Sequence, residues 1–143
     1  MNPLLRNFGS GLAGLLTGSV LNGMIIRYSH WLIPPPPGVD LTTEAGLKSG
    51  MQLMGPQHFI MPFLAHALGT LAGAILAARL SNALRPPMII AILFLAGGMY
   101  MVILLPSPLW FNVLDLTMAY FPMAWLGYRL GRKGNPGSSK QSV

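Results

Sequence analysis

The sequence contains no cysteine and very few acidic residues. Its 143 residues include three carboxylates, Asp40, Glu44 and Asp115, against nine Lys and Arg. Without cysteine the chain forms no disulfide, offers no thiolate to a metal and has no cysteine nucleophile. The sequence also lacks the GxxxxGK[ST], GxSxG and HExxH motifs, so it contains no recognisable catalytic motif for hydrolysis or phosphoryl transfer. We therefore predict that the protein is not an enzyme and has no catalytic residues.

Charged residues are missing from long stretches of the chain. Only 8% of residues are charged and 52% are hydrophobic, whereas about 25% of the residues of soluble domains are charged. Asp, Glu, Lys and Arg are absent from 7–26, 59–78, 86–114 and 116–128. Because about 20 apolar residues cross a bilayer as a helix, the sequence predicts an all-α integral membrane bundle of four transmembrane helices, at about 8–29, 59–80, 87–105 and 109–130.

The predicted helices belong to one domain, 1–132, followed by a basic tail at 133–143 that we expect to be disordered. The connections 81–86 and 106–108 are short, which favours antiparallel neighbours. The longer loop, 30–57, opens with the run Pro34–Pro37, which cannot continue a helix. Within this loop, Thr42 or Thr43 is a candidate N-cap for a short interfacial helix that ends near Leu53.

The basic residues are distributed unevenly between the two sides of the predicted bundle. Arg27 and Lys48 fall on the side of the loop 30–57, and the other seven fall on the opposite side: Arg6, Arg79, Arg85, Arg129, Arg132, Lys133 and Lys140. Cytoplasmic loops retain Lys and Arg, so we predict cytoplasmic N and C termini and an outward-facing loop. Since these residues flank apolar segments, the expected partner is the lipid bilayer and not nucleic acid.

Small residues recur every fourth position in the first two predicted helices. Gly14 and Gly18 form such a pair in the first, and Gly69 and Gly73 in the second. This spacing lets helix backbones approach closely inside a membrane. It indicates either packing within one chain or self-association of two chains, and the sequence favours packing within the chain.

Asp115 is the one carboxylate inside a predicted transmembrane helix, and His66 lies at a similar depth in another. Intramembrane ionisable residues are costly and often functional. We predict that the two residues form a buried polar pair, supported by Asn112 one turn before Asp115 and Thr70 one turn after His66. The competing hypothesis is that the pair only fixes helix register. No spacing of ligands predicts a metal site, and no cofactor is required, although His66 is a possible axial ligand for haem or a pigment.

Two segments carry a resemblance. The residues FLAHALGTLAGAILAARL at 63–80 and PSPLWFNVLDLTMAYFPMAWLGYRL at 106–130 resemble an uncharacterised family of small four-helix bacterial inner-membrane proteins. The resemblance implies a multi-pass protein of the cell inner membrane. It includes His66 and Asp115, and it implies no activity for either.

These features lead to two hypotheses of different classes. The first is a non-enzymatic accessory or structural subunit that packs with other membrane subunits or with itself through its small-residue faces. The alternative is a small proton-coupled transporter or carrier that uses the Asp115–His66 pair as a homo-oligomer. An enzyme acting on lipid lacks a nucleophile or a metal in this sequence.

Overall fold

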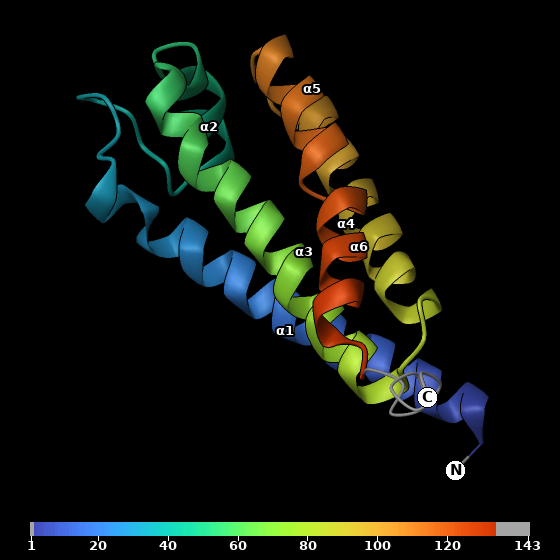
Figure 1. Ribbon diagram of the computed structural model, residues 1–143. Coiled ribbons are helices and arrows are strands. Elements are labelled where there is room, and N and C mark those ends of the chain that lie inside the picture. The colour runs from blue at the N-terminus through green and yellow to red at the C-terminus, as the bar shows by residue number, and fades with distance from the viewer. Residues whose placement is uncertain (1, 134–143) are drawn as a thin grey trace, which may run out of the picture.

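The computed structural model describes residues 2–133, and these form helices and no strand (Figure 1). The all-α class predicted from the sequence is confirmed. The predicted tail 133–143 lies outside the described residues except for Lys133. In chain order the elements are α1 (Pro3–Leu32), α2 (Glu44–Met51), the short 3-10 helix η1 (Pro56–Phe59), α3 (Ile60–Ser81), α4 (Arg85–Leu104), α5 (Leu109–Met118) and α6 (Phe121–Gly131).

Three helical segments of the described chain are long and apolar enough to cross a membrane. They are Pro3–Leu32, Pro56–Ser81 and Arg85–Leu104. Many large apolar side chains on their outer faces are exposed, for example Leu16 at 60% and Ile103 at 83%. A soluble monomer rarely exposes so much contiguous apolar surface, and this surface is that of a membrane protein.

The last predicted helix is not continuous. The sequence predicts one helix over 109–130, and the structure has two, α5 and α6, joined at Ala119 and Tyr120. Pro122 explains the break, because it has no N–H to donate to the carbonyl of Met118 and its ring collides with that carbonyl in a straight helix. A new helix begins where the N–H of Ala124 donates to the carbonyl of Tyr120 at 2.8 Å.

The small residues of α1 and α3 lie against each other within the chain. A Cβ atom added to Gly18 would lie 2.6 Å from the carbonyl oxygen of Gly69, and one added to Gly69 would lie 2.8 Å from that of Gly18. Gly14 and Gly73 face each other in the same way one turn further along. The two backbones therefore approach as closely as glycine allows, as expected for packing inside one chain.

The C-terminal halves of α3 and α6 are packed just as tightly. A Cβ atom on Gly127 would lie 2.6 Å from the Cβ of Ala74, and one on Gly131 would lie 3.0 Å from that of Ala78. Ala74, Ala78 and Ala124 are fully buried. Small side chains thus close this half of the bundle.

The two ends of the bundle differ in what they carry. The N-terminus, the turn from α3 to α4 and the end of α6 share one end, while α2 and the start of α5 lie at the other (Figure 1). The backbone N–H of Lys133 donates to Asn82 Oδ1 at 3.0 Å, which ties the end of α6 to the α3–α4 turn. This end holds every described Lys and Arg except Arg27 and Lys48.

The short helix α2 forms where the loop sequence predicts one. Thr43 is its N-cap, with Oγ1 accepting the N–H of Gly46 at 3.1 Å. Just before it, Asp40 accepts the hydroxyl of Thr42 at 2.6 Å and its N–H at 2.8 Å. These hydrogen bonds, the hydroxyl of Thr42 first, hold the pKa of Asp40 below its usual value. The loop is therefore an ordered cover over its end of the bundle.

Candidate functional site

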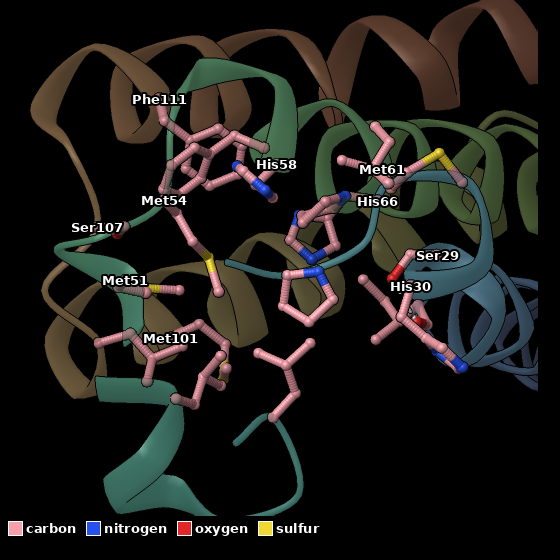
Figure 2. A pocket seen from close by; sticks show the side chains of 18 of the residues that line it. Ser29, His30, Met51, Met54, His58, Met61, His66, Met101, Ser107 and Phe111 are labelled. Carbon is pink, nitrogen blue, oxygen red and sulfur yellow. Dashed lines mark hydrogen bonds between the residues drawn. The ribbon is translucent and has the colours of Figure 1, made fainter. Parts of the chain in front are cut away.

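A cavity of about 1120 Å³ opens in the half of the bundle that α2 covers. Its walls come from the C-terminal part of α1, the following loop, α2, η1, the start of α3, the end of α4 and the start of α5. Figure 2 shows Met51, Met54 and Met101 on one side of this space and His66, Ser29 and His30 on the other. Binding sites for small molecules are commonly about 300–1,000 Å³ and mostly apolar. The size and lining of this cavity suit such a ligand.

The deepest lining residues are His66 of α3, Gly98 of α4 and Asp115 of α5. Beyond them Ala67 and Ala119 are buried in a cluster with Tyr120, and the small residues of α3 and α6 fill the rest. The cavity is consequently closed toward the basic end, and the polar residues His66 and Asp115 lie at its floor.

Three side chains make a hydrogen-bonded network at this floor. His66 Nδ1 lies 2.8 Å from Asp115 Oδ1 and 2.9 Å from Oδ2. The Tyr120 hydroxyl donates to Asp115 Oδ2 at 2.9 Å. The Asp115 side chain is only 5% exposed, and a carboxylate buried so deeply needs such partners. The structure thus brings together the two residues that the sequence pairs by depth.

One ring nitrogen of His66, Nε2, is not used within the hydrogen-bonded network. Its Nδ1 is engaged by Asp115, while Nε2 has no hydrogen-bond partner within residues 2–133. The side chain is 21% exposed, and it lines the cavity. A carboxylate behind one nitrogen orients the ring and tunes the other, as in many sites where histidine binds a ligand or moves a proton. Nε2 is therefore the atom of the network that can contact a ligand.

Tyr120 is the member of the network that the sequence analysis missed. In one straight helix, residue 120 would lie about 140° around the axis from residue 115, on a different face. The break before Pro122 turns Tyr120 back toward Asp115, and its ring stacks on His66 with centroids 5.9 Å apart. The available signal was a tyrosine two residues before a proline in a helix that contains a buried carboxylate.

Gly98 gives the Tyr120 hydroxyl room to reach Asp115. A Cβ atom added to Gly98 would collide with that hydroxyl and lie 2.8 Å from Tyr120 Cζ, whereas one added to Gly97 has nothing within 4 Å. We expect Gly98→Ala to displace Tyr120, break its bond to Asp115 and lower stability by about 1–3 kcal/mol. Gly97→Ala, the control, should be neutral or slightly stabilising. Chemical denaturation of the two variants in detergent checks this, and equal stabilities would contradict it.

The two predicted supporting residues do not join the network directly. Thr70 is fully buried, and its hydroxyl donates to the backbone carbonyl of His66 at 2.7 Å, not to the ring. Asn112 lines the cavity but pairs with Ser107, whose hydroxyl donates to Asn112 Oδ1 at 2.6 Å. Thr70 therefore supports the helix that carries His66, and Asn112 fixes the start of α5.

The other two histidines line the same cavity nearer its mouth. His58 bridges two backbone carbonyls, with Nδ1 3.1 Å from Gly55 O and Nε2 3.1 Å from Pro34 O. A neutral ring donates only one of these bonds, and only the imidazolium donates both. This contact attaches the Pro-rich segment to η1. No group of three or more His, Cys, Asp or Glu side chains placed to hold a metal occurs in the described part of the chain.

Comparisons of this sequence and structure with family models, with curated proteins and with solved structures give no match. The network and the cavity are therefore the features from which a function can be inferred.

Proposed function

We propose that this chain is a non-enzymatic, multi-pass protein of the bacterial inner membrane that binds a small amphipathic molecule in its cavity, with His66 as the contact residue. One observation carries the proposal: His66 lines the cavity and is held by buried Asp115 through Nδ1, while Nε2 has no hydrogen-bond partner in the described chain. A pair that only fixed helix register would not require a cavity beside it. The largest apolar pocket with a few convergent polar groups is the default binding site of a protein.

The proposal includes a fourth membrane segment made of α5 and α6 in succession. Together these helices span Leu109–Gly131, about 34 Å of helix at 1.5 Å per residue, and a hydrocarbon core is about 30 Å thick. A proline-broken helix is tolerated there when neighbouring groups satisfy the freed backbone. Four crossings put both termini on one side, and the excess of Lys and Arg at that end supports the cytoplasm.

A reporter fusion tests this topology. We expect green fluorescent protein attached after Val143 to fluoresce in bacterial cells, because it matures in the cytoplasm, and alkaline phosphatase at the same position to be inactive. Alkaline phosphatase inserted after Gly38, in the loop before α2, should be active. The reverse pattern at either position would contradict four crossings with cytoplasmic termini.

Native mass spectrometry of the purified protein tests the binding proposal. We expect protein extracted in mild detergent from bacterial membranes to carry a small molecule that denaturation releases. Met101→Trp should exclude it, because this side chain lines the cavity but makes no bond to the network. Leu93→Trp, on the exposed face of the same helix at 48% exposure, is the matched control and should retain it. Equal ligand content in both variants would overturn the proposal.

The same measurement addresses the accessory-subunit hypothesis, which stays a prediction. Exposed side chains along α1, such as Leu12 and Val20, suit lipid and a partner helix equally. Companion chains in fixed ratio would establish a complex, and an absorption band would identify a pigment or haem at His66.

The alternative hypothesis, proton-coupled transport, requires a second conformation in which the cavity opens to the opposite side.

A further inference from the structure

The ionisable groups that line the cavity are mostly bases. Arg27 and His30 contribute from α1, His58 from η1 and His66 from α3, while Asp115 is the one acidic residue of the described lining. Asp115 is already engaged by His66 and Tyr120. Arg27 makes no ion pair within the described chain. The cavity lining therefore contains one guanidinium, that of Arg27, without an ion pair in the described chain, beside a mostly apolar interior.

The His66–Asp115 pair has two states that differ by one proton. With Asp115 ionised and His66 neutral, Nδ1–H donates to the carboxylate and Nε2 is an acceptor. When His66 takes up a proton and becomes an imidazolium, both ring nitrogens carry hydrogen, and Nε2 becomes a donor.

We infer that the ligand is an amphipathic anion, a carboxylate on an apolar chain, and that its binding takes up a proton at the His66–Asp115 pair. The inference rests on the proposed function, since it specifies the ligand of the same cavity. The apolar chain contacts the methionine-lined walls, and the carboxylate accepts a charge-assisted hydrogen bond from Nε2–H. Because the anion prefers the protonated pair, binding and proton uptake favour each other by linkage.

The groups that determine this protonation are few. Asp115 on α5 and Tyr120 at the start of α6 contact His66 directly. Arg27, His30 and His58 also line the cavity, and the guanidinium of Arg27 favours an anion there. Because the proposed binding takes up a proton, linkage predicts that anion affinity falls as pH rises.

Calorimetric titration of the full chain in phosphatidylcholine nanodiscs, with dodecanoate as the probe, tests the inference. The binding enthalpy is measured at one pH in buffers of different ionisation enthalpy. The slope of the binding enthalpy against the buffer ionisation enthalpy gives the number of protons taken up. We expect net uptake by the wild-type chain after subtraction of empty nanodiscs. His66→Gln should abolish this uptake and weaken binding roughly 10- to 100-fold, as expected for loss of a charge-assisted hydrogen bond.

A matched ligand and a matched variant sharpen the result. Dodecanamide has the same chain without the charge and should bind at least about tenfold more weakly than dodecanoate. Arg27→Gln should weaken dodecanoate binding. Lys48→Gln should not, because Lys48 is paired with Glu44 at 2.7 Å and does not line the cavity.

Two outcomes would overturn the inference, and one of them spares the proposed function. If dodecanoate and dodecanamide bind equally and His66→Gln weakens both, the cavity binds at His66 but does not select an anion. If dodecanoate does not bind, or binds without proton uptake that depends on His66, the anion proposal fails. The co-purified molecule then decides the proposed function separately.

Discussion

Asp115→Ala is expected to destabilise the protein by about 2–3 kcal/mol. The substitution removes the acceptor of two hydrogen bonds, so His66 and Tyr120 lose their partner inside the bundle. An unpaired buried polar group costs about 1–3 kcal/mol, and hydrogen bonds between membrane helices contribute less than those estimates on average. Unfolding in mixed detergent micelles, followed by circular dichroism, measures the change.

Asp115→Asn separates charge from shape at this position, and Glu44→Gln is the matched control. Asp115→Asn keeps the size and the hydrogen-bonding capacity and should cost less than half as much as Asp115→Ala. Glu44→Gln removes a carboxylate that is exposed and paired only with Lys48, and it should change stability by about 0.5 kcal/mol or less. If Asp115→Ala were as stable as Glu44→Gln, the carboxylate would not hold the network together.

Gly14→Ala is expected to separate α1 from α3 and to cost about 1–3 kcal/mol, the range for overpacking a close contact. The added Cβ would lie 2.7 Å from Ile90 Cδ1 and 2.9 Å from Ala77 Cβ, and it would also collide with the carbonyl of Gly73. Backbone atoms of two packed helices cannot move apart without loss of the contacts on either side. Stability in detergent and protease susceptibility of the N-terminal helix report this effect.

Gly23→Ala on the same helix is the matched control. A Cβ atom at Gly23 meets nothing within 4 Å, and alanine is a better helix former than glycine by up to about 1 kcal/mol. We therefore expect Gly23→Ala to be neutral or stabilising. If both substitutions had the same effect, close approach of α1 and α3 at Gly14 would not be the feature that joins them.

The sequence predicts most of the helical framework because charge and length limit what a membrane-crossing helix can contain. The predicted ranges 59–80 and 87–105 lie within two residues of the bounds of α3 and α4 at each end. The first helix is longer than its predicted range 8–29, since α1 begins at Pro3, includes Arg6 and ends at Leu32. A charged side chain limits the part of a helix that sits in hydrocarbon, but long side chains reach water from inside the helix itself.

Less of the candidate site than of the helical framework could be predicted from the sequence. Depth in the membrane is enough to pair His66 with Asp115, because both lie at similar distances from the same helix ends. Tyr120 was missed because its position depends on a break that changes which face it occupies. The cavity could not be predicted either, since it depends on how α1, α4 and α5 are placed beneath the α2 loop.

The most direct test of the central claim is the ¹⁵N chemical shift of the His66 ring during titration with dodecanoate or the co-purified molecule. The three histidines are assigned by His30→Gln and His58→Gln. We predict that the ligand shifts the Nε2 signal of His66, while Nδ1 keeps its bond to Asp115. Unchanged His66 signals at saturating ligand would contradict the assignment of this residue as the binding group of the cavity.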